Sequence, residues 1–278
     1  MAAIAKQFVF DAATRELWRV AETGDTDALA GILSRGVDVN ARNQHGVTAL
    51  MRAAHYGHDR MVRLLLEQGA DPNQQLFFKP PNVRGGLHTR GATPLIRAAF
   101  NNDLEVMKLL LEKGADATLP TADRQTAIHA VLAGRAPEPQ AVELIKALQK
   151  AGADVNVVAL INHGEEIRGG SALHYAVRKR YKEVMKLLAS YKVDLDAMDQ
   201  DGLTALDYTQ SRGFMPFMAL QTPQFKDEAA LLRELGATKL LAKNPVWPVL
   251  GPPQGVWPDI WPVGEPRVHD PVYHRESD

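Results

Sequence analysis

The sequence contains no cysteine. This absence excludes a disulfide framework, a cysteine-ligated zinc or iron–sulfur site and a cysteine nucleophile. No apolar run approaches the roughly 18 residues of a membrane-spanning helix, so no span is expected. The chain also lacks an excess of one charge, because 32 Lys and Arg stand against 33 Asp and Glu among its 278 residues. A net charge of −1 does not suit a protein that coats nucleic acid by charge, so nucleic acid is not an expected partner.

Catalytic motifs are missing as well. The sequence has no glycine-rich phosphate loop, no nucleophile elbow and no His-Glu-x-x-His motif. His55 and His58 have a spacing that can ligate a metal, but a helix surface and a turn explain them better. The segment 163–166 places a histidine beside two carboxylates without partners at a defined spacing. We therefore expect no enzyme, no cofactor and no metal site, unless residues distant in the sequence converge.

The chain contains an internal repeat. One tetrapeptide recurs with gaps of 45, 33, 45 and 33 residues, at Thr48–Met51, Thr93–Ile96, Thr126–His129, Ser171–His174 and Thr204–Asp207. A Gly-Ala-Asp motif or a variant of it follows each copy and also occurs once before the first, at 36–38, 69–71, 114–116, 152–154, 192–194 and 236–238. A period of this length indicates stacked units of one supersecondary type.

In these motifs the chain resembles the ankyrin repeat family, and in particular bacterial multi-repeat members. Residues 46–73, from Gly-Val-Thr-Ala-Leu to Gly-Ala-Asp-Pro-Asn, match almost every framework position of the 33-residue ankyrin unit. The resemblance covers roughly residues 11–240 and implies an all-α solenoid of about six helix-turn-helix repeats. It implies little about a ligand, because the matching residues are structural ones.

Local chemistry supports the same unit. Thr or Ser is expected to cap each first helix, and Pro94 suits a first helical position, where its missing N–H is not needed. The pairs Ala53–Ala54 and Ala98–Ala99 are small where two helices must approach closely. The glycine of Gly-Ala-Asp is expected to end the second helix in the left-handed conformation. At His129 and His174 the resemblance implies an imidazole bonded to the backbone of a neighbouring loop.

The spacing predicts the domain organisation. We expect an ankyrin domain over 1–242, with repeats near 11–43, 44–73, 91–119, 122–156, 169–199 and 200–240. Extra residues enlarge the loops at 74–90 and 157–169, and a further insertion falls around 213–225. Insertions in a solenoid lie in loops, often on a binding face.

The last 36 residues, 243–278, form a Pro/Trp-rich C-terminal extension. They hold eight of the 17 prolines and three of the four tryptophans, Trp247, Trp257 and Trp261. Proline at this density disfavours helix and sheet, and a disordered tail rarely exposes three Trp. We expect the three rings to dock on the last repeats as a non-helical cap. The alternative is a linker or a peptide that binds a partner.

The resemblance implies where a partner would bind, namely on the outward positions of the first helices along the concave side. These positions combine basic and aromatic residues without an acid: Arg52, His55, Tyr56, Arg97, Phe100, Asn101, Tyr175, Arg178, Lys179, Tyr208 and Arg212. Phe77 and Phe78 in the first enlarged loop either tuck onto the solenoid or present an apolar contact. Such a groove suits a protein with an acidic surface or segment.

The expected function is therefore a non-enzymatic protein-binding scaffold. One alternative is a fixed subunit of a larger assembly, in which the tail and long loops reach its neighbours. Another is an enzyme or small-ligand protein with a pocket under the 74–90 and 157–169 loops. The sequence leaves the oligomeric state open. In the absence of a recognisable leader we expect a cytoplasmic protein, or an exported or periplasmic one if a leader was removed.

Overall fold

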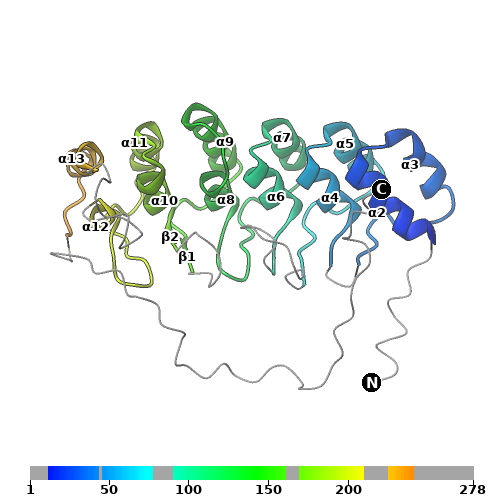
Figure 1. The fold of residues 1–278 in the computed structure, drawn as a ribbon, viewed down its shortest axis with the longest axis horizontal. Coiled ribbons are helices and arrows are strands. Elements are labelled where there is room, and N and C mark those ends of the chain that lie inside the picture. The colour runs from blue at the N-terminus through cyan, green and yellow to red at the C-terminus, as the bar shows by residue number, and fades with distance from the viewer. Residues whose placement is uncertain (1–11, 44–45, 78–89, 161–168, 210–224, 241–278) are drawn as a thin grey trace, which may run out of the picture. The chain divides into compact units, whose positions relative to one another are not determined.

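The computed structural model describes residues 12–43, 46–77, 90–160, 169–209 and 225–240. Within them, the helices form two layers that alternate along the chain (Figure 1). The first layer contains α2 (Ala12–Thr23), α4 (Ala49–Tyr56), α6 (Pro94–Asn101), α8 (Ala127–Ala133), α10 (Ala172–Lys179) and α12 (Ala205–Tyr208). The second contains α3 (Thr26–Leu33), α5 (Asp59–Glu67), α7 (Leu104–Glu112), α9 (Glu138–Lys150), α11 (Lys182–Ser190) and α13 (Lys226–Leu235).

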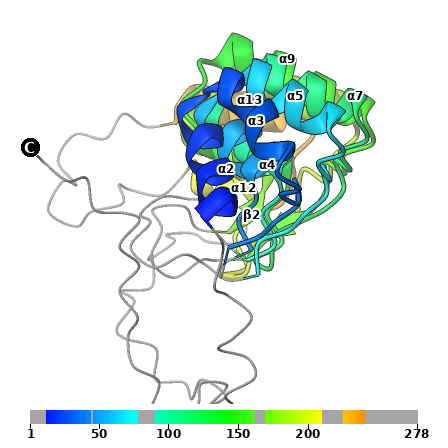
Figure 2. The same ribbon diagram turned by 90° about the vertical axis from the view of Figure 1, so that its right-hand side faces the viewer.

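Along the chain each first-layer helix packs against the next first-layer helix, and α2, α4, α6, α8 and α10 also pack against their own second-layer partners. Figure 2, which looks along the row, shows the loops between repeats projecting to the same side of the two layers. A helix pair of this size cannot bury its apolar stripe alone, so the pairs depend on stacking. The all-α helix-turn-helix solenoid predicted from the sequence is confirmed, whereas the count of six repeats stays a prediction.

The predicted helix starts are observed. Thr48 Oγ1 accepts a hydrogen bond from the backbone N–H of Met51, and Thr93 Oγ1 accepts one from Ile96, each at 3.2 Å. Pro94 is the first residue of α6. These contacts satisfy N–H groups that the first turn of a helix leaves without an intrahelical acceptor.

The predicted left-handed ends of the second-layer helices are also observed. Gly69 and Gly114 have φ angles of 85° and 88°, which residues with a Cβ resist. In the fifth repeat Lys192 occupies the equivalent place at φ 57°, so that unit carries backbone strain that glycine would relieve.

Small residues line the contact between neighbouring repeats. Ala53, Ala54, Ala98 and Ala99 are all fully buried, because α4 and α6 lie side by side. The second-layer helices contribute larger side chains to the core, such as Leu65, which is also fully buried. Burying one such leucine contributes about 1.5–3 kcal/mol to the free energy of folding.

Backbone hydrogen bonds close the bases of two long loops. Leu76 N donates to Ala92 O at 3.1 Å, and Gly91 N donates to Leu76 O at 2.8 Å. Farther along, β1 (Val158–Ala159) pairs antiparallel with β2 (Gly170–Ser171). The loop segments 78–89 and 161–168, and the tail with its predicted docking residues Trp247, Trp257 and Trp261, lie outside the described residues. The predicted domain boundaries stay predictions.

Asparagine side chains join consecutive repeats at the ends of their second helices. Asn73 Nδ2 donates to Gly114 O at 2.9 Å, and its Oδ1 accepts from the backbone N–H of Asp116 at 2.8 Å. Asn40 makes the same pair of bonds to Gly69 and Asp71, one repeat earlier. In the next repeat the equivalent residue is Thr118, whose hydroxyl donates to Asp116 Oδ1 in its own turn at 2.6 Å.

Replacing the bridging asparagine should therefore weaken the stack more than replacing its threonine counterpart. We expect Asn73→Ala to lower the free energy of unfolding by about 1–3 kcal/mol, because it removes two bonds between repeats. The matched control Thr118→Ala should lower it by less than about 1 kcal/mol. Urea unfolding followed by circular dichroism measures both values, and equal losses would contradict the bridging role.

Candidate protein-binding face

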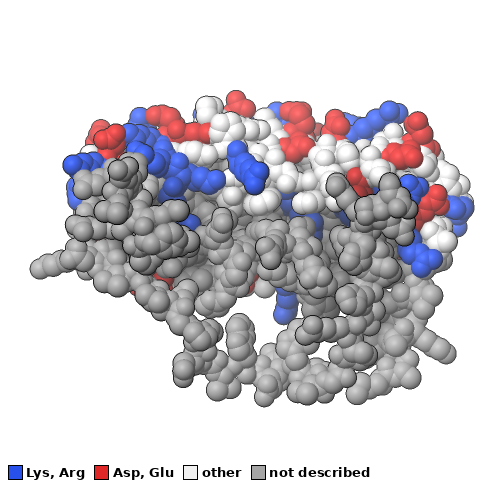
Figure 3. All heavy atoms as spheres, viewed as in Figure 1, with Lys and Arg blue, Asp and Glu red and all other residues white. Residues whose placement is uncertain are grey.

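The accessible part of the predicted binding set lies at the C-terminal ends of first-layer helices. Tyr56 ends α4 and is 49% exposed. Phe100 and Asn101 end α6, and Arg178 and Lys179 end α10, all of them exposed or half-buried. On the face seen in Figure 3, Lys and Arg side chains gather over the α10 to α13 part of the molecule. We call Tyr56, Phe100, Asn101, Arg178 and Lys179 the helix-end row.

Contacts between repeats hold this row in place. The amide Nδ2 of Asn101 donates to the carbonyl of His55, which joins the end of α6 to that of α4. Lys179 Nζ donates to Gly134 O at 2.7 Å, which joins α10 to the turn after α8. A Cβ on Gly134 would lie 2.4 Å from Phe100 O, so only glycine permits this approach. The C-terminal ends of α4, α6, α8 and α10 therefore have fixed relative positions.

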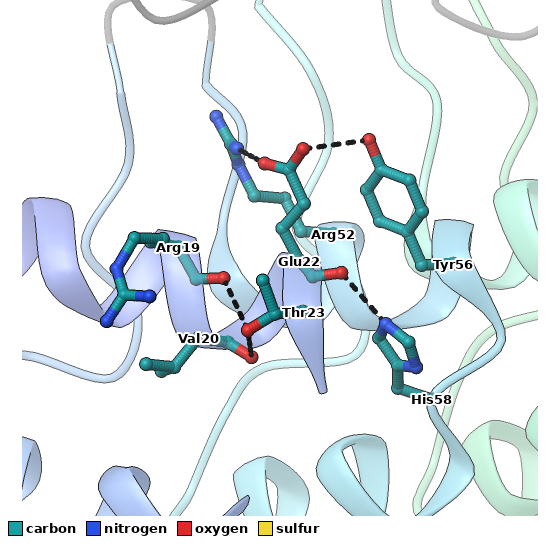
Figure 4. Close-up of polar contacts among 7 residues, drawn as sticks. All are labelled: Arg19, Val20, Glu22, Thr23, Arg52, Tyr56 and His58. Atoms are coloured by element: carbon teal, nitrogen blue, oxygen red, sulfur yellow. Dashed lines mark hydrogen bonds and ion pairs between the residues drawn. The ribbon is translucent and has the colours of Figure 1, made fainter. Parts of the chain in front are cut away.

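The N-terminal repeat adds an acid beside the row. Figure 4 shows Glu22, near the end of α2, between Arg52 and Tyr56. Its carboxylate forms an ion pair with Arg52 Nη1 and accepts a hydrogen bond from Tyr56 Oη at 3.0 Å. The carbonyl of Glu22 contacts His58 Nε2 at 2.8 Å. Arg52 is thus neutralised within the chain.

The structure buries four of the predicted partner-binding side chains. Arg52 is 7% exposed and Arg97 is 4% exposed, while Tyr175 and Tyr208 are each 4% exposed. Tyr208 Oη donates to Asp199 Oδ2 at 2.6 Å, and burial together with this bond raises its pKa. These residues lie inside the stack, where they support the row.

Each buried tyrosine packs against the histidine of the preceding repeat. The rings of His129 and Tyr175 meet edge-on at 5.3 Å between centroids, and those of His174 and Tyr208 at 5.0 Å. His129 Nε2 contacts Gly170 O at 3.1 Å, and His174 Nε2 contacts Leu203 O at 3.0 Å. The predicted bonding of these imidazoles to neighbouring loops is confirmed.

Burial keeps His129 and His55 neutral at pH 7. It is the largest cause that lowers the pKa of His129 to about 4 and that of His55 to about 4. At His55 the cation of Arg97 lowers the pKa further, while Glu22 opposes the shift. The half-buried His55 therefore adds no positive charge to the binding face.

The base of the first enlarged loop borders a cavity of about 660 Å³. Its lining includes Phe77, which is 48% exposed, and Arg90. The guanidinium of Arg42 lies 4.8 Å from the centre of the Phe77 ring. The other two predicted contact residues, Phe78 and Arg212, lie outside the described residues.

Two charged residues of this region were not predicted from the sequence. Gly24 and Gly57 are 33 residues apart, which is one repeat. Aligning the first two repeats on these glycines places Glu22 at the position of His55 and would have identified it as a residue of the binding face. Arg135 follows Gly134 in a turn lengthened by an insertion, and no repeat position corresponds to it. Its exposure beside Lys179 appears only in the structure.

The described residues hold no cluster of three or more His, Asp or Glu that could bind a metal ion. Within the same segments, no helix is both long and apolar enough to cross a membrane.

Family comparison identifies the repeats. A model of ankyrin repeats in many copies matches residues 32–77, and a model of three ankyrin repeats matches 74–159 and 136–214. The chain belongs to the ankyrin repeat family. Ankyrin repeats generally mediate interactions between proteins and are generally non-catalytic, so the family favours a protein partner for the face described above.

Individual ankyrin relatives match only short segments. The chain is 46% identical over 57 residues to a mitochondrial disaggregase of Bos taurus, covering 20% of this chain and 8% of the relative. It is 35% identical over 60 residues to an ankyrin repeat-containing protein of Schizosaccharomyces pombe, covering 22% and 29%. A potassium channel of Oryza sativa matches at 46% over 54 residues, covering 19% and 6%. The chain thus spans less than a third of each of these relatives.

The ion pair at the N-terminal end of this ankyrin stack should be structural. We expect Arg52→Met, which keeps much of the side-chain volume, to lower the free energy of unfolding by about 1–3 kcal/mol. A double-mutant cycle with Glu22→Gln measures the coupling between the two side chains. Additive losses would show that the pair contributes nothing.

Stability should fall in acid because buried His129 resists protonation. The backbone N–H of Thr126 donates to its Nδ1 at 3.3 Å, so a proton there would remove an acceptor. The folded-state pKa of His129 is lowered to about 4. Its contribution to the free energy of unfolding is therefore complete above pH 6.5 and is lost as the pH falls toward 4. His129→Gln should reduce the slope of the free energy of unfolding against pH by up to about 1.4 kcal/mol per pH unit. Urea unfolding between pH 7.5 and 4.5 measures it, and an unchanged slope would contradict the assignment.

Proposed function

We propose that this chain is a non-enzymatic protein-binding scaffold or complex subunit whose partner contacts the helix-end row and the inserted loops. The observation that carries the proposal is the accessible row itself. Its aromatic and basic side chains come from α4, α6 and α10, and bonds between the repeats hold them in position. A surface fixed before binding loses little conformational entropy when the partner arrives.

The two parts of the row are expected to act differently. Tyr56 and Phe100 provide aromatic area, the type of side chain that most often dominates binding energy at protein interfaces. Arg178 and Lys179 provide positive charge, which selects a partner with an acidic surface and speeds its association. The buried Arg52 and Arg97 support this surface and are not placed in the contact.

Site-specific photocrosslinking tests the proposed face. A photoreactive p-benzoylphenylalanine in place of Tyr56 preserves an aromatic ring at the last residue of α4. The same group in place of Arg63, an exposed residue of the second-layer helix α5, provides the matched control. In an extract of the source cells, we expect a defined protein adduct at position 56 that is absent at position 63.

An adduct of equal yield at both positions would contradict a partner at the helix-end row. A competition arm strengthens the result. Excess unlabelled chain should suppress the adduct at position 56. Excess chain carrying Tyr56→Ala and Phe100→Ala should suppress it at least about tenfold less effectively, because the loss of each aromatic side chain weakens partner binding by about 1–2 kcal/mol. Equal suppression by both competitors would remove these two aromatic residues from the interface.

A small-molecule function is the second candidate, and the cavity of about 660 Å³ beside Phe77 and Arg90 favours it. Its volume lies within the range of ligand pockets. Thermal-shift screening against metabolites addresses it. A ligand that stabilises the chain but not its Arg90→Ala variant would support this candidate.

A further inference from the structure

Three basic residues, two of them members of the helix-end row, lie close together at the end of α10. Arg135 lies in the turn between α8 and α9, and Arg178 and Lys179 end α10. The bond from Lys179 Nζ to Gly134 O places the ammonium group next to the peptide unit of Arg135. Arg135 and Arg178 are exposed, and Lys179 is half-buried. We call these three residues the basic triad.

Three acids near the triad have partners on other residues. Glu228 pairs with Arg180, whose Nε lies 3.1 Å from its Oε1, and Asp227 pairs with Lys182 at 2.9 Å. The carboxylate of Glu138 accepts from the backbone N–H of Glu183 at 2.6 Å, so it faces the start of α11. Among the described residues, no ion pair joins Arg135 or Lys179 to an acid.

The triad therefore carries mutual repulsion. Partial burial is the largest cause that lowers the pKa of Lys179, and the cations of Arg178 and Arg135 lower it further. The carbonyl groups at the end of α10 offset some of this repulsion, because a helix C-terminus favours positive charge. They do not remove it, so a negative group placed among the three cations would be attracted to all of them.

We propose that the basic triad binds an acidic segment of the partner protein, with carboxylates paired to Arg135, Arg178 and Lys179. This inference rests on the proposed protein-binding function and specifies the chemistry of its partner. The fork of an arginine guanidinium matches a carboxylate with two parallel hydrogen bonds. A peptide chain can place successive carboxylates along the few residues that the triad spans.

Nucleic acid fits the site less well. A phosphate backbone needs a longer basic track, and tight binding usually involves many phosphate contacts. The net charge of −1 provides no general attraction either.

The test uses a defined probe, a fluorescein-labelled peptide of eight glutamates, and fluorescence anisotropy with the full chain. We expect Arg135→Glu combined with Lys179→Glu to weaken binding at least about tenfold at low salt. The matched control combines Lys146→Glu with Lys150→Glu, two exposed residues of α9 that change the net charge by the same amount. The control should change the affinity by less than about twofold.

Several outcomes would overturn the inference. These are no binding of the peptide to the wild-type chain, equal losses in both double variants, equal affinity for an eight-glutamine peptide, or tighter binding of a single-stranded oligonucleotide at the triad. Melting followed by circular dichroism checks that the variants fold. If the charge-reversed protein does not, the milder pair Arg135→Gln and Lys179→Gln should still weaken binding about threefold or more, and no loss there would also overturn it.

The outcome separates this inference from the proposed function. A specific adduct at position 56, together with peptide binding that the triad variants do not weaken, would support the protein-binding face and contradict a role for the triad. Triad-dependent peptide binding without any adduct would keep the acid-binding site and remove Tyr56, at the other end of the helix-end row, as a partner contact.

Discussion

The close approach of first-layer helices from neighbouring repeats is the contact on which the other features depend. Alanine pairs such as Ala53–Ala54 and Ala98–Ala99 leave room for the helices to lie side by side, and all four residues are fully buried. A larger side chain at these positions would push the repeats apart. The asparagine bridges, the histidine–tyrosine contacts and the fixed helix ends all require the spacing that alanine allows.

This packing also determines which residues remain for recognition. An internal first-layer helix such as α4, α6, α8 or α10 is covered on two sides by its first-layer neighbours and on a third by its second-layer partner, so most of its length is unavailable. Its C-terminal end is the part where side chains such as Tyr56 and Lys179 reach solvent. The same contacts that stabilise the stack thus hold a binding surface in one arrangement, and the partner need not order it.

Local signals made the fold predictable, and contacts between repeats limited the prediction of the site. The caps at Thr48 and Thr93 and the left-handed Gly69 follow from neighbouring residues, so the sequence was sufficient for them. The burial of Arg52 was not predictable in this way, because its partner Glu22 lies 30 residues earlier in a repeat that lacks the tetrapeptide. Exposure at one repeat depends on side chains of the next, which periodicity alone does not reveal.

Hydrogen–deuterium exchange of the free chain, resolved by mass spectrometry, tests most directly whether neighbouring repeats cover the first-layer helices. Amide groups exchange when a helix opens locally, and a helix packed on several sides opens rarely. We expect slower exchange in α4, α6, α8 and α10 than in α5, α7, α9 and α11, which are buried over a smaller fraction of their length. Equal exchange in the two layers, or faster exchange in the first, would contradict the account.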